Sequence, residues 1–596
     1  MMTSPLSARR RTPRQPRHMQ PHRRRRYPEE QRLEMPKPTQ KAVRVIPLGG
    51  FEEVGRNMMV IEYGDDRLII DIGLRFPEED TPGIDFIIPN ISYLRGKEKT
   101  IHGIFITHGH YDHMGALPYL LRDLGNPPVY TTALTRGMIL KRQEDFPDSP
   151  KPQIHLLKKG DPTPMRLDPF IIEHFHVNHN IPDSIGLAIK TPIGTIVHTC
   201  DFKFDFKPVG DEPADLQKIA EIGSRGVLCL LSDSTGAEHP GYSLSESVIM
   251  ENLDPIFKNA EGRVIMATFA SLIGRLQQGF LLAEKYGRKV AIDGYSMKAN
   301  VEVARALGHL KIPQGMLVDV RDAEKIDPKR VAVFCTGAQG EARAVLMRIA
   351  NREHRFITLH PNDTVIFSSS IVPGNERQVQ YLKDAVMRQG AHVFHYRMMD
   401  IHASGHAYAE DLKLMLALVK PRFLVPIHGQ YSMLKTHAEL AETMGIPREN
   451  VAVGFNGAII EVGHDKIQVR REKAPAQYVF VDGLGVGDVK EIVLRDRQQM
   501  AGDGMFVIIA VVDTHAGKVK GSPDVISRGF VYLKESQQLL REARDLVRNN
   551  IEGHAQRAQQ QPNWMHVKES IKEELGRFLF EKTQRRPMVL PVIIEV

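Results

Sequence analysis

The sequence predicts an α/β protein of several domains, in which one α/β domain is interrupted by another and is followed by a smaller α+β domain. Its 596 residues exceed the usual size of a single domain. Between about residues 236 and 398, apolar strand-like runs alternate with amphipathic stretches, and this succession predicts a parallel sheet covered by helices on both faces. Strand-like runs that lead into histidines occur before and after this stretch, which indicates that the stretch is an insertion.

The segment Thr107–His113, with the sequence THGHYDH, directly follows the apolar run Ile104–Ile106. The run is typical of a buried strand, and the glycine between the first two histidines lets the backbone turn out of the sheet. Histidines two positions apart point to the same side and can bind one ion, whereas the later residues can reach a second ion about 3.5–4 Å away. Imidazole and carboxylate groups suit zinc or manganese, and the alternative is a solvated loop rich in histidine. The candidate ligands in this segment are His108, His110, Asp112 and His113.

Two further candidate ligands follow strand-like runs. The run Phe170–Phe175 leads to His179, which lies beside a proline-containing turn where its side chain can face a cleft. His174 and His176 lie within the strand itself and are typical strand residues, so His179 is the preferred ligand. Asp201 ends a hairpin strand, where its two oxygens can bind one metal each. An aspartate at such a position can equally form a turn, but its place after the other candidates favours the metal.

The inserted stretch shows the alternation in detail. Its strand-like runs are 263–269, 289–293, 331–334 and 364–367, and its amphipathic stretches include 275–286 and 341–351. After the insertion, the segments Asp400–His406 and Pro426–Gly429 again place histidines after strand-like runs. The first domain is therefore expected to resume there.

The C-terminal part shows a different pattern. A charged segment, Lys466–Lys473, is typical of a linker, and the run Met505–Val512 is typical of a buried strand. Two helical stretches and a closing strand follow, at about 534–551, 566–582 and 588–596. This pattern predicts a compact α+β domain without an obvious catalytic cluster, in which Trp564 is a packing anchor rather than a base-stacking platform.

Composition restricts the class of protein. Cys200, Cys229 and Cys335 all lie in apolar strands or at their ends, which argues against a disulfide framework and suits a reducing compartment. No apolar run approaches the roughly 18 residues that cross a bilayer, and the N-terminus has no apolar signal core. We therefore expect a soluble, cytoplasmic protein without a membrane partner.

The string from His108 to His113 resembles the signature of the metallo-β-lactamase superfamily, which implies a fold and a metal site but no particular substrate. Further motifs narrow the resemblance to the β-CASP group of nucleases and, within it, to the ribonuclease J family. These motifs are SDST (232–235), TGAQGE (336–341), PGNE (373–376), HASGH (402–406), PIHG (426–429), VDGLGVG (481–487), SRGFVY (527–532) and RRPMVLPV (585–592). The resemblance runs from about residue 42 to the end, through a C-terminal region that other β-CASP nucleases do not share.

The resemblance implies a metallo-β-lactamase αββα sandwich interrupted by a β-CASP α/β domain and followed by a C-terminal α+β domain. The expected divisions are a basic disordered tail (1–41), the first part of the metallo-β-lactamase domain (42–235), the β-CASP domain (236–398), the second part (399–460), a linker (461–478) and the C-terminal domain (479–596).

The resemblance also implies two divalent metal ions, zinc before manganese or magnesium. One ion would be held by His108, His110 and His179, and the other by Asp112, His113 and His428. Asp201 would bridge both ions and thereby take part in catalysis.

Besides Asp201, five residues are implied in catalysis or substrate binding. His406 would donate a proton near the scissile phosphate, and Asp233 would orient it and balance its charge. His402, Ser404 and Gly405 would form, together with His406, a pocket for a terminal 5′-monophosphate. The alternative for this loop is that it needs Gly405 for its backbone angles.

The implied function is a metal-dependent ribonuclease that degrades and matures RNA from its 5′ end, with internal cleavage as a second activity and a preference for 5′-monophosphate ends. The competing enzyme functions are a β-CASP DNA nuclease and a purely endonucleolytic RNA processor. A non-enzymatic competitor is an RNA-binding scaffold that has lost activity. The implied partners are RNA, a second or further copies of the chain in a homodimer or homotetramer, and other proteins of RNA degradation.

The positive charge is concentrated in the first 41 residues. The whole chain carries +7, and residues 1–41 contain ten Arg and two Lys against three Glu, so the remainder carries about −2. Such a segment cannot build a core, but it can add salt-dependent affinity for RNA phosphates. The alternatives are a dispensable extension, a start at Met35, or an organelle-targeting peptide.

Several residues depart from the family pattern. Cys200 stands where glycine is usual, and Tyr295 stands where the motif Gly-Arg-Ser-Met is usual. Leu272 and Gly274 stand where polar or bulkier residues are usual, Gln430 where glutamate is usual and Asn90 where aspartate is usual. None of them is an expected metal ligand, so hydrolysis should survive. Cys200 could approach a metal, but a small buried residue is the preferred interpretation.

Overall fold

The structure is a computed structural model that describes residues 40–78, 81–161, 163–372, 374–483, 485–487, 489, 491–532, 535–557 and 562–596. Residues 1–39 of the expected basic tail therefore lie outside the described residues. Within these ranges, no helix is long and apolar enough to cross a membrane.

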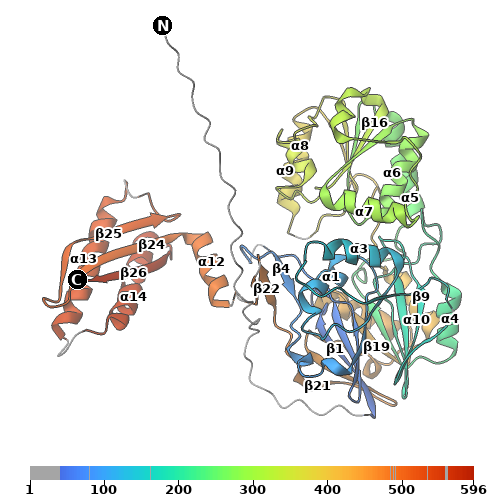
Figure 1. The fold of residues 1–596 in the computed structure, drawn as a ribbon, viewed down its shortest axis with the longest axis horizontal. Coiled ribbons are helices and arrows are strands. Elements are labelled where there is room, and N and C mark those ends of the chain that lie inside the picture. Colours follow the sequence, from blue (N-terminus) through green and yellow to red (C-terminus); the bar gives the residue numbers. More distant parts are fainter. Residues whose placement is uncertain are drawn as a thin grey trace, which may run out of the picture.

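Two sheets pack face to face in the first domain (Figure 1). The eight-stranded sheet has the order β21-β20-β1-β2-β3-β5-β6-β7, with β1 Ala42–Gly49, β2 Met58–Tyr63, β3 Asp66–Ile70, β5 Ile101–Phe105, β6 Val129–Thr131, β7 Ile154–Leu156, β20 Ala458–Gly463 and β21 Ile467–Lys473. The six-stranded sheet has the order β19-β12-β11-β10-β9-β8, with β8 Met165–Leu167, β9 Phe170–His176, β10 Ile185–Thr191, β11 Gly194–His198, β12 Cys229–Asp233 and β19 Phe423–Ile427. Val45 of one sheet and Leu187 of the other share a buried cluster, so a core lies between the sheets.

Helices cover the outer faces of both sheets, which gives the expected αββα order (Figure 1). Ile46 of β1 lies in one buried cluster with Leu134 of α3, and Val197 of β11 lies in another with Met415 of α10. The helices of this domain are α1 Tyr111–Met114, α2 Leu117–Leu120, α3 Ala133–Gln143, α4 Leu216–Ser224, α10 Ala409–Val419 and α11 Tyr431–Thr443.

The insertion forms a parallel sheet of order β15-β14-β16-β13-β17-β18 with helices on both faces, as predicted. Val264 of β13 packs with α5 and α6, whereas its neighbour Ile265 packs with α8 and α9, because successive strand residues point to opposite faces. The strands are β13 Val264–Ala267, β14 Lys289–Asp293, β15 Leu317–Val318, β16 Val331–Cys335, β17 Thr364–Phe367 and β18 His392–His395. The helices are α5 Glu246–Asn259, α6 Ile273–Lys285, α7 Tyr295–Ala306, α8 Val345–Ala350 and α9 Glu376–Met387.

The C-terminal part is α+β, as predicted. Strand β24 (Met505–Asp513) lies between β25 (Lys518–Arg528) and β26 (Met588–Glu595), and one face of this sheet is covered by α13 (Gln537–Arg557) and α14 (Trp564–Thr583). Trp564 packs against the core of this domain, which agrees with its interpretation as an anchor. Helix α12 (Glu491–Asp503) precedes β24.

Two segments differ from the sequence predictions. The expected linker contains β21, which pairs with β20 at the edge of the sheet. The charged residues of β21 alternate with Ile467 and Val469, and an edge strand with an exposed face tolerates this composition. Strand β22 (Val479–Asp482), expected at the start of the C-terminal domain, instead pairs with β4 (Phe86–Ile88) of the first domain and with β23 (Gly485–Val486).

Candidate metal centre

The candidate ligands lie in loops that follow strands of the two sheets. Strands β11, β12 and β19 are parallel neighbours, so the residues at their carboxyl ends meet at one edge of the six-stranded sheet. Asp201 follows β11, Asp233 ends β12 and His428 follows β19. The loop after β5 and the short helix α1 bring the remaining ligands to this edge, and His179 follows β9.

Three histidine rings converge on one point. His110 Nδ1 lies 3.1 Å from His108 Nε2 and 3.1 Å from His179 Nε2. Burial and the neighbouring imidazoles hold the pKa values of His108 and His110 well below their usual range, and burial lowers the pKa of His179 to about 3. Neutral rings whose nitrogens face one another in this way offer lone pairs to a cation.

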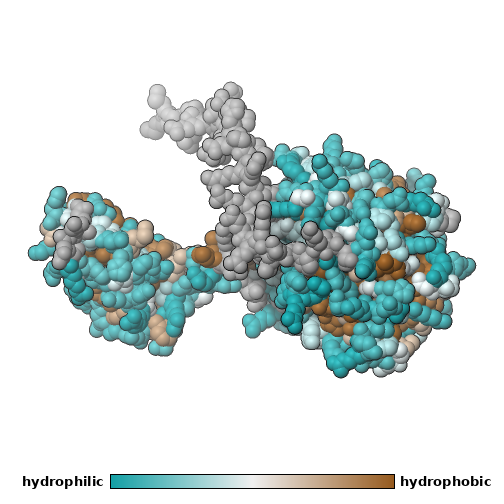
Figure 2. All heavy atoms as spheres, turned by 90° about the horizontal axis from the view of Figure 1, so that it is seen from below, coloured by the Kyte–Doolittle hydropathy of each residue, from teal (hydrophilic) through white to brown (hydrophobic). Residues whose placement is uncertain are grey.

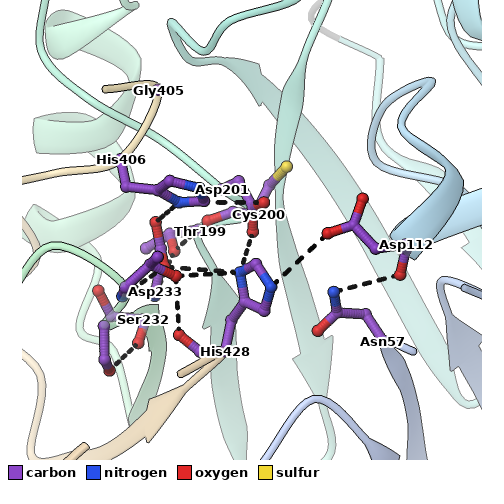
Figure 3. Close-up of polar contacts among 12 residues, drawn as sticks. Asn57, Asp112, Thr199, Cys200, Asp201, Ser232, Asp233, Gly405, His406 and His428 are labelled. Atoms are coloured by element: carbon purple, nitrogen blue, oxygen red, sulfur yellow. Dashed lines mark hydrogen bonds and ion pairs between the residues drawn. The ribbon is translucent and has the colours of Figure 1, made fainter. Parts of the chain in front are cut away.

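Asp201 belongs to a second group and also lies close to this first one. Figure 3 shows Asp201 beside His428 of the second group. Its Oδ2 is 3.1 Å from His113 Nε2, and its Oδ1 is 2.8 Å from His428 Nδ1. The same Oδ2 lies 3.9 Å from His108 Nε2. Asp112 Oδ2 completes the second group at 3.8 Å from His428 Nε2. A residue that bridges two ions would have to lie within reach of both groups, and Asp201 does so.

In the second group, positive charge on the histidine rings offsets the negative charge of Asp201. Although burial opposes it, the charge of Asp201 raises the pKa of His428 to about 10 and that of His113 well above its usual range. Burial alone would raise the pKa of Asp201, but the two imidazoles hold it well below the usual range. Without an ion, the protonated rings therefore balance the buried carboxylate.

The donor set fits a divalent ion. His428 Nε2 is buried and has no hydrogen-bond partner among the described residues, although it lies in the same group as Asp112, His113 and Asp201. A buried ring nitrogen without a partner is costly unless another group binds it. Imidazole and carboxylate donors are those that zinc and manganese prefer.

His406 and Asp233 adjoin the second group (Figure 3). His406 Nδ1 lies 2.9 Å from Asp233 Oδ2 and 4.0 Å from Asp201 Oδ2. The side chain of His406 is 18% exposed and that of Asp233 only 1%, so the histidine is the member of the pair that faces solvent. Burial opposes protonation, but the charge of Asp233 raises the pKa of His406 above its usual value.

The loop that carries His406 also supports the three-histidine group. The carbonyl oxygen of Gly405 accepts a hydrogen bond from His179 Nδ1 at 2.7 Å, which leaves His179 Nε2 for a metal. A Cβ atom at Gly405 would lie 2.6 Å from His179 Cε1 and from the Asn180 side chain, and Gly405 has no positive φ. The alternative that Gly405 serves backbone angles is therefore wrong, because close packing is what requires glycine here.

The other two loop residues take different positions. Ser404 Oγ accepts a hydrogen bond from the backbone amide of His406 at 3.1 Å. Burial, aided by the positive charge of Arg275, lowers the pKa of His402 to about 3, and its Nδ1 has no hydrogen-bond partner among the described residues.

Two residues of the site had not been anticipated. Asp71 Oδ2 lies 2.8 Å from His113 Nδ1, and its Oδ1 accepts a hydrogen bond from the backbone amide of Thr107 at 2.8 Å. Asn57 Nδ2 lies 3.1 Å from His113 Nε2. Asp71 directly follows the apolar strand β3, the same signal that identified Asp201, whereas no local pattern marks Asn57.

The departures from the family pattern lie mostly away from the ligands. Tyr295, at the start of α7, is 73% exposed, and the Asn90 side chain accepts a hydrogen bond from the backbone amide of Ser92. Gln430 precedes α11 and is exposed. Cys200 is buried beside Asp201, as expected for a small buried residue (Figure 3).

Four family models match the chain. A model of the metallo-β-lactamase superfamily matches residues 52–221, and one of the ribonuclease J β-CASP domain matches 261–386. A model of a Zn-dependent metallo-hydrolase RNA specificity domain matches 374–452, and one of the ribonuclease J C-terminal domain matches 492–596. Use of a divalent metal follows from these matches.

Curated relatives cover nearly the whole chain. Ribonuclease J 1 of Streptococcus pyogenes serotype M3 is 40% identical over 93% of this chain and 97% of its own length, and ribonuclease J2 of Bacillus subtilis is 37% identical over 94% and 100%. A crystal structure of a protein of unknown function from Enterococcus faecalis covers 72% of this chain and all of its own at 17% identity, with a TM-score of 0.51, and shows a similar fold. On the strength of the full-length relatives and the matching domains, this chain belongs to the ribonuclease J family.

Proposed function

We propose that this member of the ribonuclease J family is a metal-dependent ribonuclease that hydrolyses RNA from its 5′ end, with internal cleavage as a second activity. The observation that carries the proposal is the convergence of two ligand groups on Asp201, with His406 and Asp233 beside them. One divalent ion, zinc by preference, is assigned to His108, His110 and His179. The second is assigned to Asp112, His113 and His428.

The side chains meet the chemical needs of phosphodiester hydrolysis. When bound, divalent ions neutralise charge on the phosphate and lower the pKa of an attacking water. His406 donates a proton from its Nε2 to the leaving oxygen, because Asp233 holds its Nδ1 and keeps the ring protonated. Asp201 and Asp233 are both buried, so their positions are fixed before the substrate binds.

The proposed preference for a 5′-monophosphate rests on the loop 402–406. The unpartnered His402 Nδ1 is a buried polar atom, and the cations Arg275 and Lys203 contribute positive potential at its ring. The Ser404 hydroxyl and the backbone at Gly405 lie between His402 and the proton donor along the chain. These groups suit a terminal phosphate with several negative oxygens.

One digestion experiment tests the proposal. Labelled RNAs with a 5′-monophosphate, a 5′-triphosphate or a circular backbone, and a DNA of matched sequence, are incubated with wild type, His110→Ala and His174→Ala. His174 is a matched control, because its ring contacts the carbonyl oxygen of Lys158 and belongs to neither ligand group. We expect mononucleotides from the 5′-monophosphate RNA with wild type and His174→Ala only.

Other outcomes identify the competing functions. Cleavage of DNA would indicate a DNA nuclease, equal cleavage of circular RNA would indicate a purely endonucleolytic processor, and binding without products would indicate an inactive scaffold. Activity that survives in His110→Ala would reject the assigned metal centre.

We also propose that the C-terminal sheet joins copies of the chain into a homodimer or homotetramer. On its face opposite α13 and α14, Val507 lies between Ile526 and Leu590, with Val592 and Ile594 further along β26. Strands β24 and β26 are apolar on this face, whereas β25 adds the charged residues Lys520, Asp524 and Arg528. Figure 2 shows hydrophobic atoms on the surface of this domain. A self-complementary apolar face is typical of a twofold interface.

The assembly is tested by sedimentation of Val592→Lys, which should be smaller than wild type. Met565→Lys is the control, because Met565 is 78% exposed at the start of α14 and lies outside this face. Equal sedimentation of all three proteins would reject the interface.

A further inference from the structure

Cys200 occupies a backbone conformation that favours glycine. Its φ is +64°, in the left-handed region that residues with a side chain enter at a cost. The backbone is held on both sides of the residue, since its amide donates to His198 Nδ1 at 3.0 Å and its carbonyl oxygen accepts from Thr199 Oγ1 at 2.7 Å. The family resemblance also implies glycine here, so this chain keeps a thiol at a position that does not favour one.

The thiol contacts a candidate metal ligand. Cys200 Sγ lies 3.3 Å from His108 Nδ1, and Thr107 Oγ1 lies 3.1 Å from the same nitrogen. The Thr107 hydroxyl donates its own proton to Asp71 Oδ2 at 3.0 Å, so its oxygen is an acceptor toward the ring. His108 Nδ1 therefore carries its proton between an oxygen and a sulfur, while Nε2 faces His110.

We propose that Cys200 is a positioning residue for the metal centre: its thiol holds the His108 imidazole so that Nε2 faces His110 and His179. Of the two side chains that contact His108 Nδ1, Thr107 and Cys200, only Thr107 would remain if glycine stood at position 200. The ring nitrogen opposite the metal sets both the tautomer and the orientation of a histidine ligand, and loss of such a partner lowers metal affinity about 10–100-fold. The inference rests on the proposed metal centre and adds a residue that the family pattern does not supply.

Three substitutions distinguish the effect of the contact between the sulfur and His108 from the effect of the backbone strain. Cys200→Ala removes the sulfur and keeps the strained conformation, Cys200→Gly removes the sulfur and the strain together, and Cys200→Ser replaces the sulfur by another hydrogen-bonding atom. Cys229→Ala is the matched control, because Cys229 is also fully buried but its Sγ contacts the carbonyl oxygen of Leu230 at 3.8 Å. Zn²⁺ is titrated into each metal-free full-length protein against a chromophoric chelator, and the melting temperature of each metal-free protein is recorded.

The affinity for one of the zinc equivalents should fall about tenfold in both Cys200→Ala and Cys200→Gly, and Cys200→Ser should recover most of it. Cys200→Gly should also bind zinc weakly, but its melting temperature should not be lower than that of Cys200→Ala, because glycine relieves the backbone strain. Cys229→Ala should melt lower than wild type with unchanged affinity. Wild-type affinity in both Cys200→Ala and Cys200→Gly would overturn the proposal.

His110→Ala distinguishes this result from failure of the proposed function. If His110→Ala also bound zinc as tightly as wild type, the metal centre itself would be wrong. If His110→Ala lost zinc while Cys200→Ala and Cys200→Gly retained it, only the role of Cys200 would be rejected.

Discussion

Replacement of Glu246 by Gln should loosen the contact between the inserted domain and the two-sheet domain. Glu246, at the start of α5, accepts hydrogen bonds at 2.8 Å from Arg275 Nη2 and from Gln278 Nε2. Its Oε1 also lies 3.5 Å from the Nζ of Lys203, a buried residue of the first domain. Arg275 in turn donates to the carbonyl oxygen of Ile401, next to the loop 402–406. The carboxylate therefore links both domains and, through Arg275, the loop 402–406.

The contribution of the Glu246 carboxylate to stability follows from its pKa. Burial opposes ionisation, but the charges of Arg275 and Lys203 lower the pKa from its ordinary 4.5 to about 2. A difference of this size corresponds to about 3 kcal/mol of stability at pH 7. Because the folded pKa is the lower one, this contribution is present above pH 4.5 and is lost as the pH falls from 4.5 to 2. At about pH 3.5 it should have decreased to about 2 kcal/mol.

Hydrogen exchange of the amides in α5 and α6 is the suitable assay, because a chain of several domains does not unfold in one step. At pH 7 the opening free energy of these helices should be about 3 kcal/mol lower in Glu246→Gln than in wild type, and the difference should narrow toward pH 3.5. Glu251→Gln is the control, since Glu251 is exposed on the same helix. Equal protection in the two variants, or a difference that does not depend on pH, would refute the reasoning.

Three further predictions concern the site and the tail. His406→Ala should lower the single-turnover rate of RNA hydrolysis about 10²–10⁴-fold at unchanged metal content, because it removes the proposed proton donor, and a wild-type rate would contradict this role. Gly405→Ala should lower the metal content measured by mass spectrometry, since its Cβ would collide with His179, and full occupancy would contradict the packing argument. Deletion of residues 1–41 should flatten the dependence of RNA affinity on salt without changing the chemical rate, and an unchanged slope would reject the phosphate-binding tail.

Local pattern was sufficient for the insertion and for the C-terminal sheet and helices, whereas the αββα order of the first domain was expected from the family resemblance. The alternation of apolar runs and amphipathic stretches predicted the parallel sheet of the insertion, because its central strands β13, β16 and β17 are buried on both faces. Strands β21 and β22 escaped prediction for a different reason. Each pairs with a strand far away along the chain or lies at a sheet edge, so its own residues carry little of the information that places it.

The candidate metal centre likewise contains residues that local sequence pattern identifies and residues that depend on contacts between distant segments. His108, His110, Asp112 and His113 are adjacent along the chain, and their spacing alone indicated metal. The roles expected of His406 and Asp233 came from the family resemblance, and the structure places the two side chains together. The contact of Gly405 with His179 and that of Cys200 with His108 depend on tertiary packing, for which no spacing rule exists.

The metal content of Asp201→Asn, measured together with its activity on 5′-monophosphate RNA, tests the central assignment most directly, because Asp201 lies close to both ligand groups. Asp161→Asn is the control, since Asp161 is an exposed aspartate outside the site. Wild type and control should bind about two ions per chain and degrade the RNA, whereas Asp201→Asn should lose metal and at least about 10²-fold of the rate. Full metal content and wild-type hydrolysis in Asp201→Asn would contradict the assignment.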